Sequence, residues 1–391
     1  MTKPAKAVLW ILWAMLAAFG AVGIAERVLL GHRLSAYTSY VPWGMWVAAY
    51  IYFIGLSAGA FLLSSLIYVF GVHRLERIGR LSLYVAVVTL LMALLTIWFD
   101  IGHMERFWEV FSRPQFHSMM AWMVWLYTAY FVLLLGELYY AMRRDWAKLS
   151  EAQVTGDNRR LRILGTIGVP LAIAFHGGVG SLFGTVVARD LWHSPIYPLL
   201  FLAGALISGG GLITFVVAYF WSSRDEAWRD LTQSLGKILL GLLAIGILLE
   251  WAEYSIPMWY GVGEEYTRLV YVLFGPYWYV YWGIHVLVGV AIPVLMLWRS
   301  RNPFAIGTAG GLIAATYFAE RLNLVIPGLV FPELKGLESA YLSHRLSYAY
   351  FPSLFEWQVV AGVAAIGIAL FYVGYRYLPL AGAHTRLRGV A

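Results

Sequence analysis

Ten runs of predominantly apolar residues recur along the chain. Each has close to the ~20 residues that an α-helix needs to cross the hydrocarbon core of a bilayer. Because hydrocarbon offers the backbone no hydrogen-bond partners, we expect such runs to cross it as helices. The runs are residues 7–24, 43–70, 81–99, 118–142, 163–187, 196–221, 236–256, 271–298, 304–326 and 355–377. The sequence therefore predicts an all-α polytopic membrane protein with about ten transmembrane helices.

Charged residues make up 13% of the 391 residues, and hydrophobic residues make up 61%. A soluble domain has about 25% charged residues, so this composition excludes a water-soluble globular enzyme. The longest stretches outside the apolar runs, residues 143–162 and 327–354, are too short to fold alone. We therefore expect a single integral membrane domain over residues 1–391.

The sequence has no cysteine. It therefore has no disulfide, no cysteine-ligated zinc and no iron–sulfur cluster of its own. A haem b needs two axial ligands at one depth on facing helices. Only His176 and His285 lie well inside apolar runs, and their expected depths differ, which argues against haem. If this protein handles electrons, a partner subunit must carry the metal.

Lysine and arginine are unevenly distributed among the loops. With the N-terminus in the cytoplasm, 19 of the 28 basic residues fall on the cytoplasmic side, as the positive-inside rule requires. Both termini are then cytoplasmic, and the net charge of +7 comes from inward-facing loops rather than from a nucleic-acid-binding module. The first apolar run could also be a cleaved signal peptide, but we favour its retention because no clean cleavage site follows it.

Ionisable residues cluster near the outer ends of the runs, where they are functional hypotheses because charge in a membrane is costly. Asp100, His103 and Arg106 follow the third run at three-residue steps. If the helix continues, they share one face. A carboxylate, an imidazole and a guanidinium there can take a proton, pass it on and stabilise a negative charge. The alternative is an interfacial ion pair that anchors the helix end.

A second acidic group lies in the later runs. Glu250 and Glu253 are three residues apart in the seventh run, and Glu320 lies near the outer end of the ninth. Two acids this close repel each other when both are ionised, so one is expected to hold a proton. This suits a proton relay. The alternative is a static salt bridge from Glu250 or Glu253 to Arg321 or Arg268.

The two histidines inside the runs have different surroundings. His176 is followed by Gly177, Gly178 and Gly180, which leave open space and favour a hydrogen-bonding role beside a ligand cavity. For His285 we favour a buried polar contact between helices.

Two stretches of small residues, 55–60 and 204–211, follow similar Pro-containing segments. Duplication of a four-helix bundle is the simplest explanation of this similarity between the two segments. The alternative, which we prefer for most of the glycines, is that small residues let membrane helices approach closely.

Several segments together resemble the NrfD/PsrC family of quinone-interacting integral membrane subunits. They are residues 40–46, 55–60, 100–108, 176–178 with 191–195, and 320–323 with 327–328, and the similarity covers about residues 40–332. Met104 departs from the family, which often has Pro there.

The resemblance implies two four-helix bundles, residues 40–187 (helices 2–5) and 194–332 (helices 6–9), flanked by helices 1 and 10. It implies a pocket near the outer face for menaquinone or ubiquinone. It also implies two partners, a ferredoxin-like iron–sulfur subunit and a catalytic or multihaem cytochrome subunit, in the cytoplasmic membrane of a prokaryote. The protein would be the quinone-reactive subunit and would not act on the terminal substrate alone.

Quinone chemistry moves two electrons with two protons, so an acid or a base must contact each ring oxygen. We therefore expect Asp100 and His103 to exchange protons with the quinone and Arg106 to stabilise negative charge. Tyr40 and Trp43 are expected to line the mouth of the pocket.

His176 is expected to offer the quinone a second hydrogen bond. Glu250, Glu253 and Glu320 form a candidate proton route, and proton translocation across the membrane is a further hypothesis. Two other classes stay open. A secondary transporter would have broken helices and deep charges in both halves, and a passive anchor would need neither His176 nor the acid pair.

Overall fold

The computed structural model describes residues 3–68, 78–147, 149–221, 223–334, 336–341, 343 and 345–380, and these residues contain helices and no strand. The α-helices are α1 (Lys3–Leu30), α2 (Met45–Tyr68), α3 (Gly79–Asp100), α4 (Glu109–Ser112), α5 (Met119–Trp146), α6 (Glu151–Gly184), α7 (Tyr197–Phe220), α8 (Glu226–Tyr260), α9 (Gly263–Phe274), α10 (Ile292–Arg299), α11 (Pro303–Val325), α12 (Leu337–Ala340) and α13 (Leu354–Tyr377). A 3-10 helix, η2 (Met104–Arg106), follows α3, and a π-helix, η3 (Val280–Ala291), runs directly into α10.

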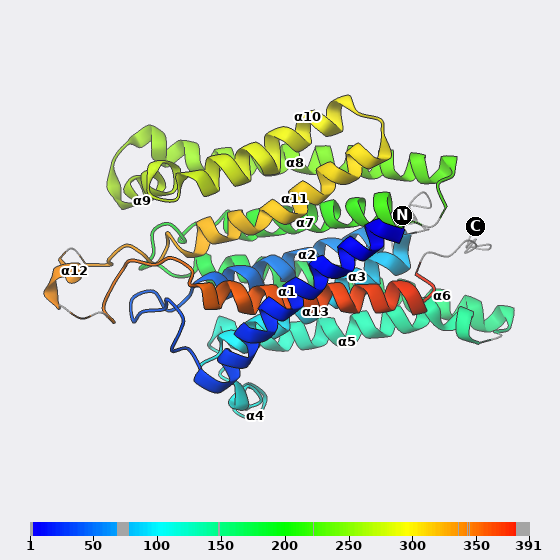
Figure 1. The fold of residues 1–391 in the computed structure, drawn as a ribbon, viewed down its shortest axis with the longest axis horizontal. Helices are drawn as coiled ribbons and strands as arrows, with labels where there is room; N and C mark the ends of the chain where they lie inside the picture. The colour runs from blue at the N-terminus through cyan, green and yellow to red at the C-terminus, as the bar shows by residue number, and fades with distance from the viewer. Residues whose placement is uncertain are drawn as a thin grey trace.

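Nine helical segments of the described residues are long and apolar enough to span a membrane: α1, α2, α3, α5, α6, α7, α8, η3 with α10, and α13. The remaining predicted run, residues 304–326, corresponds to α11, which has 23 residues and lies beside α7 (Figure 1). The polytopic all-α fold is therefore confirmed, and the protein is a multi-pass membrane protein. One boundary was wrong. The predicted run 271–298 is interrupted at residues 275–277, so that α9 is separate, and the apolar span begins at Val280.

The helices form two groups that meet along α2 and α7. In the first group α2 packs against α3 and α6, and α5 packs against α3 and α6. In the second, α11 packs against α7, α8, η3 and α10. Helices α1 and α13 pair with each other, and α13 also packs on α3 (Figure 1). The helices of the first and last apolar runs therefore flank the first group.

The two small-residue stretches face each other across the contact between α2 and α7. A Cβ on Gly59 would lie 1.9 Å from the Ala205 carbonyl oxygen, and one on Gly209 would lie 2.7 Å from the Gly59 Cα. These backbones therefore approach too closely for any side chain. The preference for close helix approach as the reason for these glycines is confirmed here.

We expect Gly59→Ala to destabilise the protein by about 3 kcal/mol, at the upper end for overpacking because the clash is with backbone. Gly156→Ala is the matched control, since a Cβ on Gly156 meets nothing within 4 Å. It should leave stability unchanged or raise it by about 0.5–1 kcal/mol through helix propensity. Thermal unfolding of the purified protein measures both, and equal stabilities would contradict the close-approach account.

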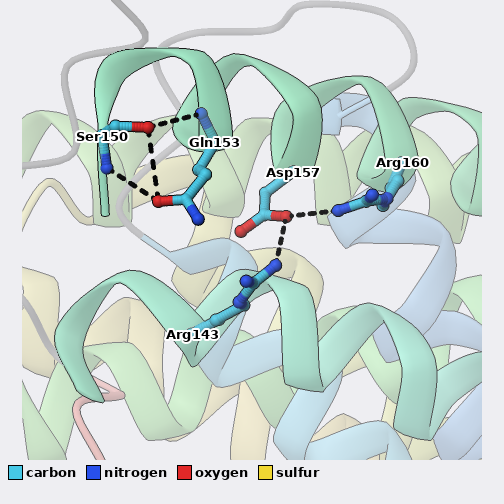
Figure 2. Close-up of polar contacts among 5 residues, drawn as sticks. All are labelled: Arg143, Ser150, Gln153, Asp157 and Arg160. Carbon is cyan, nitrogen blue, oxygen red and sulfur yellow. Dashed lines mark hydrogen bonds and ion pairs between the residues drawn. The ribbon is translucent and has the colours of Figure 1, made fainter. Parts of the chain in front are cut away.

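We call the end of the molecule that holds Asp100, the last residue of α3, the Asp100 end. Helix α1 begins and α13 finishes at the opposite end (Figure 1). There the buried Asp157 of α6 pairs with Arg143 of α5 at 3.1 Å and with Arg160 at 2.9 Å (Figure 2). This ion-pair cluster fixes α5 to α6 just beyond the capping box that begins α6.

Candidate functional site

Asp100 is held by two segments that precede it in the sequence. Its Oδ1 accepts a hydrogen bond of 2.8 Å from the Tyr37 hydroxyl, which lies between α1 and α2. Arg27 of α1 is buried and donates to the carbonyl oxygens of Phe99, at 2.6 Å, and Ile101, at 2.7 Å. The last carbonyls of a helix lack partners within it, so Arg27 completes the C-terminus of α3 and fixes where Asp100 lies.

The expectation that Asp100, His103 and Arg106 share one helical face is wrong. Helix α3 ends at Asp100, and a short non-helical stretch precedes η2. The side chains of His103 and Arg106 are 69% and 62% exposed, and both lie near Glu105, at 3.0 Å and 3.9 Å. The structure therefore separates a surface group of His103, Glu105 and Arg106 from Asp100, which lies between helices.

Tyr37 has the properties of a permanent hydrogen-bond donor. Its burial, together with the neighbouring Asp100 carboxyl, raises the pKa of the phenol well above its ordinary value. The hydroxyl therefore keeps its proton throughout the physiological range. This makes Tyr37 the group that orients the Asp100 carboxyl.

We expect Arg27→Met to lower the free energy of unfolding by about 1.5–3 kcal/mol, the range for hydrogen bonds to a charged group. Met fills a similar volume but leaves the carbonyls of Phe99 and Ile101 without a donor. Arg33→Met is the control, because Arg33 is exposed. Faster amide hydrogen exchange around residues 99–103 in Arg27→Met, but not in Arg33→Met, would place the loss of stability at the end of α3. Equal stability of the two variants would contradict this role of Arg27.

Tyr40 and Trp43 lie in the segment that leads into α2, at the Asp100 end. The Tyr40 ring stacks on Tyr348 with centroids 4.4 Å apart, and Trp43 stacks on Trp192 at 5.8 Å. Trp192 in turn donates to the Leu324 carbonyl oxygen at 2.8 Å. The segment therefore packs against the loop that follows α6 and the segment between α12 and α13, and Trp192 links it to the end of α11.

His176 lies deeper, where α6 meets α2 and α7. It is fully buried, with Nε2 2.8 Å from the Phe201 carbonyl oxygen and Nδ1 without a partner. The expected open space beside it is wrong, since a Cβ on Gly178 would lie 2.5 Å from Met123 and one on Gly180 would lie 2.7 Å from the Tyr197 carbonyl oxygen. Neighbouring segments fill the room that these glycines leave.

The acid pair of α8 is divided between two partners. Glu250 Oε2 lies 3.1 Å from His285 Nε2, and Glu253 Oε2 accepts from the Ser194 hydroxyl at 2.9 Å. The buried polar contact expected of His285 is confirmed. The alternative of a salt bridge from Glu250 or Glu253 to Arg321 or Arg268 is wrong. Arg321 pairs with Glu320 at 3.3 Å, and Arg268 pairs with Asp190 at 3.1 Å.

A small cavity lies between Glu250 and Glu320. It measures about 30 Å³, and its lining includes Glu250, Glu320, Arg321 and Asn323. This volume is enough to hold one water, and the polar side chains of the lining offer that water several partners. The cavity is too small for a quinone ring, but it provides contact between acids on α8 and α11.

His285 owes its position to irregular backbone. The Ile292 N–H donates to the Leu287 carbonyl oxygen, five residues back, as in a π-helix. Pro293, directly after Ile292, has no N–H to continue an α-helical ladder. Wide helical turns of this kind are frequent at functional sites.

Neither intramembrane histidine presents Nε2 to a haem iron, because one lies against Phe201 and the other against Glu250. Within the described parts of the protein, no group of three or more His, Asp or Glu side chains is arranged to hold a metal ion.

Sequence reasoning missed Arg27 and Tyr37. Arg27 entered only the count of loop charges, and Tyr37 lies outside the apolar runs. Both are close in sequence to the 40–46 segment that resembles the family, and this proximity could have singled them out. Their contacts with residues 99–101 span more than 60 positions of the sequence and needed the fold.

Comparison with known proteins decides the family. Residues 34–333 match the family model described as polysulphide reductase, NrfD. The chain belongs to the NrfD family. This range includes Asp100, Tyr37 and the acids of α8 and α11, whereas all of α1 and all of α13 lie outside it.

Individual relatives extend beyond that range. A selenate reductase subunit of Mesobacillus selenatarsenatis is 34% identical, over 94% of this protein and 92% of the relative. The Hdr-like menaquinol oxidoreductase integral membrane subunit of Archaeoglobus fulgidus is 31% identical, with the same coverage of 94% and 92%. The integral membrane subunit of the menaquinone reductase of Nitratidesulfovibrio vulgaris is 22% identical over 91% of this protein and 87% of the relative.

Proposed function

We propose that this protein is the quinone-reactive membrane subunit of a respiratory oxidoreductase complex, and that it exchanges electrons with an iron–sulfur partner. The family and the names of the relatives support a membrane subunit of a reductase or a menaquinol oxidoreductase. The absence of cysteine supports the partner, since the electrons of a quinol need an acceptor that this protein lacks.

The observation that carries the proposal is the Asp100–Tyr37 pair between helices at the Asp100 end. Oxidation of a quinol releases two electrons and two protons, so a base must lie at a ring hydroxyl. Tyr37 occupies Oδ1 of Asp100, which leaves Oδ2 to accept a proton. An acceptor carboxyl held by a fixed donor is the chemistry that a quinone headgroup requires.

Other residues have supporting roles in the proposal. Trp43, next to the site in sequence, lines its entrance with Tyr40. His176 offers Nδ1 as a deeper hydrogen-bonding atom. His103 and Arg106 lie on the surface where the iron–sulfur subunit would bind.

Glu250, Glu253 and Glu320 are proposed to carry protons through the second helix group, with His285 and the small cavity between them. Both termini are proposed to be cytoplasmic, in a prokaryotic cytoplasmic membrane. The basic cluster of Arg143 and Arg160 at the end opposite Asp100 supports this orientation.

The test is electron transfer from a menaquinol analogue to the acceptor subunits in the complex purified with its native partners. We expect turnover that disappears when this protein is removed and returns when it is added back. A complex that oxidises the quinol equally well without this protein would make it a passive anchor and overturn the proposal.

A further inference from the structure

Beside Asp100, which is half-buried, the last transmembrane helix contributes a second carboxyl, and this one is buried. Glu356, in the first turn of α13, has no exposed surface. Its Oε1 accepts from the Tyr350 hydroxyl at 2.9 Å, and its Oε2 accepts from the Ser353 N–H at 2.6 Å. The Tyr350 oxygen also accepts from the Met45 N–H at 2.8 Å. The start of α13 is thus bonded through Tyr350 to the start of α2.

Glycine at position 44 brings this group against the Asp100 pair. A Cβ there would lie 2.1 Å from the Tyr350 hydroxyl oxygen and 2.5 Å from Cε1 of Tyr37. Both tyrosines therefore pack against Gly44, and their ring centroids are 6.2 Å apart. The result is two tyrosine–carboxyl pairs side by side, Tyr37 with Asp100 and Tyr350 with Glu356.

The charges around these pairs are few. Asp100 and Glu356 act on each other electrostatically, and Arg27 is the cation that faces Asp100. Arg27 already donates to two carbonyl oxygens. The titratable and charged groups that face the two carboxyls or contact their tyrosines are Arg27 of α1, His32 and Tyr37 of the following segment, Asp100 of α3, Glu105 after it, Tyr277 before η3, and Tyr350 and Glu356. Among the described residues, one cation faces the half-buried Asp100 and the buried Glu356, so the two carboxyls repel when both are ionised.

His32 does not supply the missing charge. Its ring lies 5.7 Å from Tyr37, and its buried Nε2 has no partner. Burial, reinforced by Arg27, lowers the pKa of the imidazole below its ordinary value. His32 is therefore neutral at physiological pH.

Helix capping alone does not require a carboxyl at position 356. Glu356 forms a capping box with Ser353, but the capping box of α6 uses Gln153 with Ser150 in the same geometry (Figure 2). Either Glu or Gln serves at this position of the motif. An ionisable group, buried and bonded to a tyrosine, is more than the cap needs.

We propose that Glu356 is the second proton acceptor of the quinone site, reached through the Tyr350 hydroxyl. This rests on the proposed function and adds a residue outside the range matched by the family model. When a quinol loses two electrons to the iron–sulfur partner, one of its protons goes to Asp100. The other goes to the Tyr350 oxygen while Tyr350 passes its own proton to Glu356. Because one carboxyl of the pair is ionised at a time, Glu356 releases its own proton once Asp100 is neutral and then accepts the second, so that two electrons and two protons are accounted for.

The test is Glu356→Gln in the purified complex, with quinol-linked turnover measured across pH. We expect the variant to assemble normally, because Gln keeps the cap, and to lose turnover by about 10²-fold, the low end for a positioned acid–base group. Its pH profile should lose one ionisation. Tyr350→Phe should lose turnover as well, because it cuts the path to Glu356.

Two controls separate proton transfer from structure. Ser353→Ala removes the side-chain cap but keeps the carboxyl, so it should lower thermal stability and leave the pH profile unchanged. Glu338→Gln alters an exposed carboxyl of α12 and should change neither. A Glu356→Gln enzyme with wild-type turnover and pH profile would overturn the inference, as would one whose losses match those of Ser353→Ala.

The same series distinguishes this inference from the proposed function. If Asp100→Asn keeps wild-type turnover, the proposed quinone site is wrong. If Asp100→Asn loses turnover while Glu356→Gln retains it, only the role of Glu356 is wrong.

Discussion

Asp100→Asn should lower quinol-linked electron transfer by about 10²-fold or more, the contribution typical of a positioned acid–base group. Asparagine keeps the size of the side chain, and its amide oxygen can accept the Tyr37 hydrogen bond, so α3 and its contacts should persist. The amide cannot take a proton from a quinol. Steady-state turnover of the assembled complex, with partner content checked in each preparation, measures the loss.

His103→Ala provides the comparison, because His103 lies three residues away but its side chain is 69% exposed. It should lower turnover far less than Asp100→Asn does. Tyr37→Phe should fall between the two, since it frees the carboxyl without removing it. A larger loss in His103→Ala than in Asp100→Asn would move the proton acceptor to the surface group and contradict the assignment to Asp100.

The transmembrane helices were predictable because their signal is local. A run of about 20 apolar residues specifies a span whatever its neighbours do, and nine spans and α11 follow the ten runs. The wrong boundary at residues 275–277 is also local, because Gly275 and Pro276 interrupt a stretch that hydropathy alone joins.

The site was only partly predictable, because its geometry depends on contacts between distant residues. Asp100 could be singled out as an acid at a span end, but the three-residue spacing to His103 assumed that α3 continues. Arg27 ends that helix from a position 72 residues away, and Met45 bonds to Tyr350 across 305 residues. No periodic pattern in the sequence predicts contacts between residues so far apart.

The acids of the second group show the same limit. Their residue types marked them as functional hypotheses, but their partners could not be inferred. Glu250 was expected to interact with its neighbour Glu253 or an arginine, and instead it lies against His285, which η3 brings within 3.1 Å. A π-helix shifts side chains relative to an α-helical count, so the facing residue could not be found by spacing.

Glu320→Gln should lower the free energy of unfolding by about 3–5 kcal/mol, the cost of leaving a buried charge without its partner. Arg321 is only 3% exposed, pairs with Glu320, and lies with its guanidinium carbon 4.4 Å from the centre of the Phe201 ring. Adding Arg321→Met removes the orphaned charge and should restore most of the stability. Thermal unfolding of both variants in one detergent measures the effect, and a stable single variant would show that the pair is not needed for folding.

The folded double variant then separates structure from proton transfer. It lacks the acid and base of α11 but keeps Glu250, His285 and the Asp100 site. If Glu320 belongs to the proton route, the double variant reconstituted in vesicles should transfer electrons from quinol but move about 10²-fold fewer protons through the second helix group, because each missing acid–base group slows a transfer by at least that factor. Proton movement equal to the wild type would restrict Glu320 and Arg321 to holding α11 in place.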